Sequence, residues 1–298
     1  MKYTKKQFQA QYPDDGACLD AILKRQLERD PSCHGCGVTP AKFHRITGRR
    51  GYACQDCGHH VFPCVGTIFQ HSSTPLTDWF YAMYLMTATR NGVSGKELQR
   101  QLGVTYKCAW RIGHQLRILM AARDKANTPE QLSGHVEIDE TYVGGRKKTG
   151  PRRSGNKLGG PLDNKTCVMG LVERGGAFKG EVVPNARRVN LLPVVIRKVA
   201  FGTLVNTDEL STYKTLPKFG FNHEAVNHGQ NEYVRGIHHT NSVEGFWSHL
   251  KRGISSTHVA VSRKHLQKYV DEFAFRYNNR HAPAEMFNRM LAQVSKVV

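Results

Sequence analysis

Three acidic residues, Asp139, Asp208 and Glu244, have the side-chain type and spacing to hold divalent metal ions for phosphodiester chemistry. Two hard cations about 3.5–4 Å apart can activate an attacking oxygen and stabilise the leaving oxygen of a phosphodiester. Carboxylates suit Mg²⁺, which keeps water and phosphate oxygens in its remaining coordination positions. The sequence therefore predicts a site where these three acids converge on Mg²⁺, for which Mn²⁺ could substitute.

Asp139 and Asp208 fall on predicted strands. Asp139 lies in HVEIDETYVGG, where apolar residues alternate with Glu137 and Asp139, so both carboxylates point to one face of the strand. Asp208 ends the segment TLVNTD, which places an acid at the edge of the sheet. Glu137 and Glu140 are close enough to Asp139 to leave the choice of acid open. As alternatives, Asp139 could be an exposed acid at a strand end, and Asp208 could form a turn or cap a helix.

Glu244 falls in a predicted helix, TNSVEGFWSHLKRGI, whose apolar stripe is Val243, Trp247, Leu250 and Ile254. Glu244, Ser248 and Lys251 follow at i, i+4 and i+7, so they share a neighbouring stripe over two turns. A capping box formed by Asn241 and Glu244 is the sharpest alternative for this acid. Lys251 could likewise be an ordinary solvated lysine.

Four of the eight cysteines, Cys33, Cys36, Cys54 and Cys57, form two CxxC pairs separated by 17 residues. Each pair makes a turn that aims two thiolates at one point, and two such turns complete a tetrahedral zinc site. A module with so small a core depends on the metal for its folding, so we expect one structural Zn²⁺ and no catalysis there. Cys64 is expected to be a small buried apolar residue.

The stretch VSGKELQRQLGVTYKCAWRIGHQLRILM resembles a helix-turn-helix, with Gly103 in the turn. Its second helix would present Thr105, Tyr106, Lys107 and Arg111 outward, as a recognition helix does in the major groove. Trp110 is expected in the core. Many helical hairpins share this pattern, so a hairpin that does not bind DNA is the alternative.

The chain carries 43 Lys and Arg against 24 Asp and Glu, a formal net charge of +19. This surplus favours a polyanionic partner, because each phosphate that a cation neutralises releases counterions and adds affinity. The segment between Gly144 and Lys165 is rich in glycine and carries seven Lys or Arg, so it cannot bury enough apolar surface to fold alone. We interpret it as a basic loop that orders on DNA, with a solvated linker as the alternative; the cations concerned are Arg146, Lys147, Lys148, Arg152 and Arg153.

Hydrophobic residues make up 39% of the chain, which suits a soluble globular protein. No apolar stretch approaches the roughly 20 residues that span a bilayer. The N-terminal MKYTKKQFQAQYPDD lacks the apolar region of a signal peptide. The sequence therefore predicts a cytoplasmic, nucleoid-associated protein with no membrane partner.

Short β-rich segments, followed by helical periodicity from about Thr240, predict an α/β domain with a mixed sheet covered by helices. We expect three parts. Residues 1–70 hold an N-terminal helix and the zinc ribbon, residues 71–130 the helix-turn-helix-like segment, and residues 131–298 the domain that carries the acids.

Taken together, these motifs resemble those of DDE transposases and retroviral-type integrases. The order is Asp139, Asp208, then 35 intervening residues, Glu244, and Lys251 seven residues further on. CHGCG, CQDCG, GTIFQHSSTPLTDWF, IDETYVGG, TDELSTY and HTNSVEGFWSHLKRGI are most similar to insertion-sequence transposases of the ISXO type, which join a zinc ribbon to a DDE domain. The resemblance implies a ribonuclease-H-like fold with a five-stranded sheet, two Mg²⁺ ions, and DNA cleavage and strand transfer at terminal inverted repeats.

Because two element ends must be joined to target DNA, a homodimer or higher homo-oligomer is expected. Some relatives use Asn as the third metal-binding residue, so Asn241 could share or replace the role of Glu244. Two other functions stay open: a domesticated DNA-binding regulator without catalysis, and an RNase H-like nuclease or junction resolvase. The sequence names neither the terminal repeat nor the target site.

Overall fold

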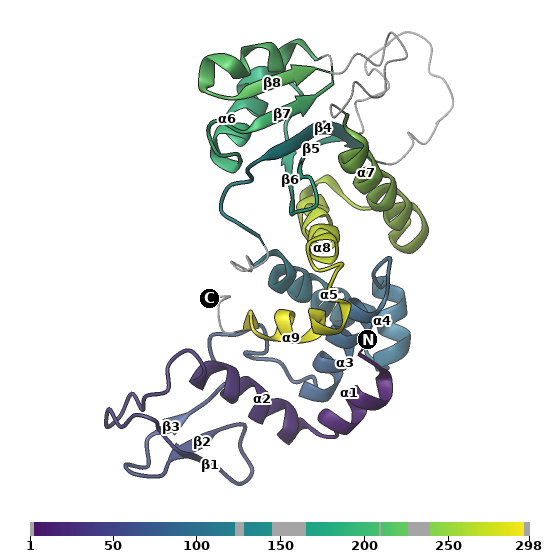
Figure 1. Cartoon of the computed structure of the whole chain (residues 1–298). Coiled ribbons are helices and arrows are strands. Elements are labelled where there is room, and N and C mark those ends of the chain that lie inside the picture. Colours follow the sequence, from purple (N-terminus) through teal and green to yellow (C-terminus); the bar gives the residue numbers. More distant parts are fainter. Residues whose placement is uncertain (1–2, 123–127, 145–164, 209, 226–238, 295–298) are drawn as a thin grey trace. The chain divides into compact units, whose positions relative to one another are not determined.

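The computed structural model describes residues 3–122, 128–144, 165–208, 210–225 and 239–294. The chain divides into two compact units (Figure 1). The first unit combines Met1–Ala122 with His281–Val298, and the second is Arg123–Arg280. Within the described residues, no helix combines the length and the apolarity needed to cross a membrane.

The helices of the first unit are α1 (Lys5–Gln11), α2 (Asp15–Leu27), α3 (Leu76–Ala88), α4 (Gly95–Leu102), α5 (Tyr106–Ala121) and α9 (Met286–Leu291), which follows the short η5 (Pro283–Glu285). Phe287 of α9 makes ring contacts with Phe8, Tyr12 and Phe80 of the N-terminal part of the chain.

The expected boundary assigned residues 131–298 to the domain with the acids. In the structure, the segment from His281 packs with the N-terminal helices instead.

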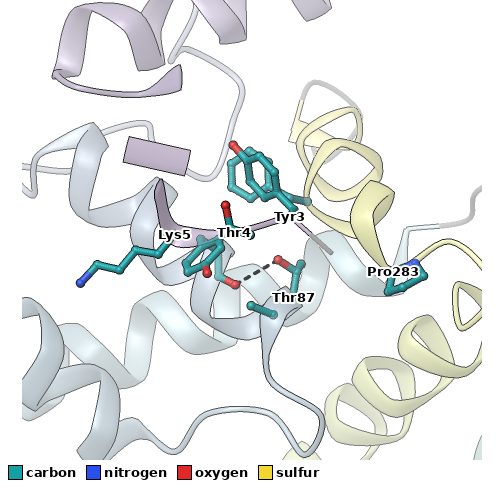
Figure 2. A pocket seen from close by; sticks show the side chains of 8 residues that line it. Tyr3, Thr4, Lys5, Thr87 and Pro283 are labelled. Carbon is teal, nitrogen blue, oxygen red and sulfur yellow. Dashed lines mark hydrogen bonds between the residues drawn. The ribbon is translucent and has the colours of Figure 1, made fainter. Parts of the chain in front are cut away.

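A small cavity of about 350 Å³ lies where the N-terminal segment, α3 and the C-terminal segment of the first unit meet (Figure 2). Aromatic rings from Tyr3, Tyr84 and Phe287 line it, and the Thr87 hydroxyl donates to the Tyr84 carbonyl at 3.1 Å. The acids singled out in the sequence do not line this cavity.

The cysteine-paired segment folds as a three-stranded antiparallel sheet in the order β1 (Phe43–Arg45), β2 (Tyr52–Cys54), β3 (His60–Val61). The first CxxC pair precedes β1, and the second begins at the last residue of β2. Gly37 and Gly58, which directly follow the two pairs, have φ angles of 75° and 72°. Only glycine adopts this left-handed conformation without steric cost, so a glycine at each of these positions permits the tight turn after each cysteine pair.

In the described part of the second unit, five strands form one sheet in the order β6-β5-β4-β7-β8. They are β4 (His135–Val143), β5 (Thr166–Glu173), β6 (Phe178–Val183), β7 (Leu204–Thr207) and β8 (Asn222–Ala225). The first three strands in sequence form an antiparallel meander, and β7 and β8 run parallel to β4. This mixed sheet has the ribonuclease-H-like topology, which confirms the expected fold class.

Helices cover both faces of this sheet (Figure 1). On one face α6 (Arg188–Lys198) and η1 (Ser211–Phe219) pack on Val136, Ile138 and Val205. On the other lie α7 (Asn241–Gly253), a π-helical turn η3 (Ile254–His258), a short η4 (Arg263–His265) and α8 (Leu266–Asn278). The alternation along β4 turns Val136 and Ile138 to the first face, so Glu137 and Asp139 share the other face, as the sequence predicted. This second face is the one that α7 covers.

Candidate active site

Strand register brings Asp139 and Asp208 together. In the parallel pair of β4 and β7, Glu137 lies beside Asn206. Continuing that register by two residues places Asp208, the residue after β7, beside Asp139. Asp208 is held in place there, because its Oδ1 accepts the Leu210 backbone N–H at 3.1 Å. The two acids, which were predicted from distant segments, are therefore neighbours on the adjacent strands β4 and β7, near the C-terminal end of β7.

Asp139 is oriented by a tryptophan from α7. The indole Nε1–H of Trp247 donates to Asp139 Oδ2 at 3.0 Å. Opposite Asp139 on β5 is Gly170, and a Cβ at that position would lie 2.4 Å from the indole ring. A glycine is therefore required here for the ring to approach the sheet and reach the carboxylate. Burial, followed by the charge of Asp208, raises the pKa of Asp139 to about 6.

Glu140 completes a compact acidic group that the sequence left ambiguous. One oxygen each of Asp139, Glu140 and Asp208 lies within 4.8 Å of the others. Burial, then the charges of Asp208 and Asp139, raise the pKa of Glu140 to about 9. Its Oε1 is buried and makes no hydrogen bond within the described residues. An ionised carboxylate with an unsatisfied buried oxygen is unfavourable, and a cation shared with the two neighbouring acids would compensate it.

Glu137 has a structural role that sequence patterns did not reveal. Its side chain is fully buried and forms an ion pair with Arg174 at 2.7 Å. Its Oε2 also accepts the backbone N–H groups of Ser242 and Val243 at 2.8 and 3.2 Å, in the first turn of α7. These N–H groups have no partner within the helix, and the positive end of the helix dipole favours a carboxylate there. Glu137 therefore fastens the start of α7 to β4.

Glu244 lies in the first turn of α7 and is exposed. Its carboxylate is close enough to contribute to the raised pKa of Asp139, although its oxygens lie outside the compact acidic group. The capping-box alternative is wrong, because Thr240 is the N-cap and no side chain caps it. Instead, the Thr240 hydroxyl donates to Glu244 Oε1 at 3.0 Å. Asn241 begins the helix and is exposed, as is Lys251 two turns beyond Glu244.

The four paired cysteines converge as predicted. One Sγ each from Cys33, Cys36, Cys54 and Cys57 lies within 4.8 Å of the others. Burial raises the pKa of the Cys33 thiol, but hydrogen bonds from the backbone N–H groups of Gly35 and Cys36 outweigh it and bring the pKa to about 7. A donor set of four sulfurs with a readily formed thiolate fits a closed tetrahedral zinc site. Cys64 is half-buried and lies outside this cluster.

The helix-turn-helix-like hairpin forms from α4 and α5. Gly103, the C-cap of α4, has φ 66°, and Gly113 of α5 lies where a Cβ would be 3.2 Å from Leu98 of α4. The second helix exposes Tyr106, Lys107 and Arg111 as predicted. Thr105 is exposed too, but its hydroxyl accepts the Cys108 N–H and caps the helix.

Trp110 does not lie in the core as expected. It is 39% exposed on α5, on the side that carries Tyr106 and Arg111, and its ring lies 3.9 Å from that of His114. The neighbouring Ala109 takes the buried position instead. The predicted basic-loop residues Arg146, Lys147, Lys148, Arg152 and Arg153 lie outside the described residues.

Comparison with known proteins identifies the family. Residues 131–278 match the model of the ISXO2-like transposase domain. A protein of transposable element ISH50 from Halobacterium salinarum is 32% identical over 257 residues, which is 83% of this chain and 84% of the relative. The chain belongs to the ISXO2-like transposases. This membership confirms the resemblance to insertion-sequence transposases that the motifs indicated.

Other matches show lower sequence identity. A transposase-like protein from Haemophilus influenzae is 29% identical over 105 residues, which is 35% of this chain and 84% of the relative. Among solved structures, a pre-cleavage Mos1 transpososome matches 72% of this chain and 78% of its own, at 11% identity and a TM-score of 0.29. A simian T-cell lymphotropic virus intasome matches 60% and 63%, at 10% identity and a TM-score of 0.31. At these TM-scores the two structures carry no inference about this chain.

Proposed function

We propose that this ISXO2-like transposase cleaves DNA at the ends of its element and joins those ends to target DNA, with Asp139, Asp208 and Glu244 as its catalytic carboxylates. The observation that carries the proposal is the pairing of Asp139 and Asp208 on adjacent parallel strands, with α7 bringing Glu244 to the same side as Asp139. Family membership supplies the reaction class, and the three acids supply the chemistry that it needs.

The donor set fits hard divalent cations such as Mg²⁺, with Mn²⁺ as a substitute. All the candidate ligands are carboxylate oxygens, and the buried Oε1 of Glu140 lacks a hydrogen-bond partner among the described residues. Asp139 and Asp208 would hold one ion together, with Glu140 beside them. Glu244, across from Asp139, would help to hold a second. Two such ions, when bound, supply activation of the attacking oxygen and stabilisation of the leaving oxygen.

The protein's own residues then position these groups. Trp247 fixes the orientation of the Asp139 carboxylate, and Glu137 fixes the start of the helix that carries Glu244. Lys251 lies two turns further along α7 and is exposed, so its ammonium group can bind a phosphate near the cleaved end. Carboxylates that are already oriented need little rearrangement when the metal and the DNA bind.

DNA recognition would involve the first unit. Tyr106, Lys107 and Arg111 project from α5 as a recognition helix requires, and Trp110 adds a partly exposed ring beside them. The ribbon, folded around one Zn²⁺, would grip the terminal repeat together with this helix. Because two ends take part in one reaction, the active form would be at least a homodimer.

The test is cleavage and strand transfer with labelled element ends, purified protein and Mg²⁺. We expect nicked ends that become joined to a target duplex, and loss of both products by at least a hundredfold in Asp208→Asn. Asp271→Asn is the matched control, because Asp271 is a half-buried acid of the same unit, as Asp208 is, but it accepts a hydrogen bond from Gln267 within its own helix and lies outside the acidic group. End binding without any cleavage would favour a regulator, and cleavage of branched DNA without joining would favour a resolvase-like nuclease.

A further inference from the structure

The chain makes an unusual turn where α7 and its π-helical extension end. Val259 has φ 63° and ψ −52°, and the Ala260 N–H donates to the His258 carbonyl at 2.7 Å. This is a γ-turn with positive φ, a rare and strained conformation. Positive φ is costly for a β-branched residue, because its Cβ crowds the backbone.

The side chain at the apex of this turn is exposed. Val259 is 81% exposed, so no packing within the described protein repays the strain. The base of the turn, by contrast, is fixed, since the His258 ring packs edge-on against Tyr269 of α8 at 4.8 Å. Strained residues persist where the surrounding structure holds them, and they concentrate at functional sites.

The formally charged residues that flank the apex in the sequence are all basic. From Gly245 to Val270 the sequence contains no Asp or Glu. Lys251, Arg252, Arg263 and Lys264 are exposed, and within the described residues none of them forms an ion pair. The next acids along the chain, Asp271 and Glu272, contact Gln267 and Arg276 instead. The turn therefore presents the large apolar side chain of Val259, beside the exposed Ala260, in a stretch of sequence whose formally charged residues are all basic.

We propose that Val259 and the flanking Arg263 and Lys264 form a DNA-contact surface, here named the Val259 turn, which consists of residues other than those of the recognition helix and the acidic group. The cations would contact phosphates, and the valine would pack into a groove against the bases. Apolar side chains used in this way against DNA occur in architectural proteins. The inference rests on the proposed function only in that the chain acts on duplex DNA.

Charge decides between DNA and a second copy of this chain as the occupant. A surface that carries only positive charge would repel an identical surface across a two-fold axis, whereas phosphates match it. The strain and the exposure of Val259 indicate that an occupant is needed, because burying this side chain in a groove gains free energy that the unbound turn lacks.

The experiment compares stability and DNA affinity in the same variants. All variants carry Asp208→Asn so that DNA is not cut, and affinity is measured by anisotropy with a fluorescein-labelled duplex of arbitrary sequence. Val259→Gly should raise Tm, because glycine adopts φ 63° without strain, and should weaken binding about tenfold, the loss expected for one buried valine side chain. Val259→Ile should keep the affinity.

Val189→Gly is the matched control. Val189 is 74% exposed and follows Arg187 and Arg188, but it lies in α6 on the opposite face of the sheet, in helical conformation. Glycine there should lower Tm and leave the affinity unchanged, the reverse of the pattern at Val259. The double variant Arg263→Gln with Lys264→Gln should reduce the slope of log affinity against log salt concentration by about 2, roughly 0.9 for each phosphate contact.

Unchanged affinity in Val259→Gly would overturn the inference. The inference would also be overturned if Val259→Gly lost self-association in the absence of DNA, measured by sedimentation, while its DNA affinity stayed the same. The turn would then be a contact between copies of the chain. If the parent protein bound no duplex, the proposed function itself would fail. The two failures are therefore distinguishable.

Discussion

The carboxylate of Glu137 accepts the backbone N–H of Ser242 at 2.8 Å and so joins the middle of the sheet to the first turn of α7, across 105 residues of sequence. The same carboxylate pairs with Arg174, whose guanidinium also donates to the His239 carbonyl at 3.0 Å. Hydrogen bonds therefore connect the chain to the sheet both before α7, at His239, and within its first turn, at Ser242. The position of Glu244 relative to Asp139 depends on this connection.

Replacing Glu137 should therefore destabilise the second unit and disturb the metal site together. Glu137→Ala leaves Arg174 without its buried partner, and we expect a loss of about 3–5 kcal/mol in the free energy of unfolding, measured by urea titration. Glu181→Gln is the control, since Glu181 is partly exposed to water, unlike Glu137, and its pairs with Arg197 and Lys198 contribute about 1 kcal/mol or less. A loss at Glu137 no larger than at Glu181 would contradict this role.

Trp247→Phe should weaken metal binding without unfolding the protein. The phenyl ring keeps the apolar packing on Gly170 but cannot donate to Asp139. Partners that orient a metal ligand typically contribute 10- to 100-fold in metal affinity or activity, so we expect about a tenfold rise in the Mg²⁺ concentration that gives half-maximal cleavage. Trp79→Phe is the matched control, because it removes a similar indole bond, to Ser72, in the first unit. Equal Mg²⁺ dependence in both variants would refute the assignment.

Local sequence patterns predicted individual helices and strands better than they predicted which strands pair with one another. The alternation around Asp139 predicted β4 and its orientation because one face of that strand is buried under apolar side chains and the other faces α7. The resemblance implied five strands, but no local pattern marked the position of β8, because Asn222–Ala225 is a short polar segment at the sheet edge. Strand pairing there comes from the parallel neighbour β7, which no local periodicity reveals.

The candidate site shows the same limit. The convergence of Asp139 and Asp208 could be predicted, because Asp139 lies within one segment with a recognisable strand pattern and Asp208 ends another. The role of Glu137 could not, because it depends on backbone N–H groups more than a hundred residues away. Trp110 was wrongly predicted to lie in the core because helical periodicity does not indicate how wide the buried stripe of α5 is. In the structure, Ala109 and Ile112 occupy this stripe and Trp110 lies outside it.

The acidic group predicts how stability varies with pH when divalent ions are absent. The folded-state pKa of Asp139 is raised to about 6 and that of Glu140 to about 9, so the folded protein binds more protons than the unfolded chain between their ordinary values and these values. The free energy of unfolding should therefore fall as pH rises from about 4 to 9. Glu140→Gln should remove most of the fall above pH 6, and saturating Mg²⁺ should oppose it. Thermal melts across this range, with zinc retained, would test both; a rise of Tm with pH in metal-free protein would exclude the arrangement.

Removing zinc should unfold the ribbon while leaving the second unit intact. Outside the metal site, the ribbon core consists of Ala41 with the partly buried Val38 and Phe43, which is too little apolar surface to fold alone. Cys36→Ser should abolish stoichiometric zinc, measured by a chromophoric chelator after thiol modification, and should make residues 33–61 sensitive to protease. Cys64→Ser is the matched control, because this half-buried thiol lies outside the cluster and its loss should leave one zinc per chain. DNA binding should fall in Cys36→Ser but not in Cys64→Ser if the ribbon grips the element end. Full zinc content in Cys36→Ser would show that the four thiols do not form the site.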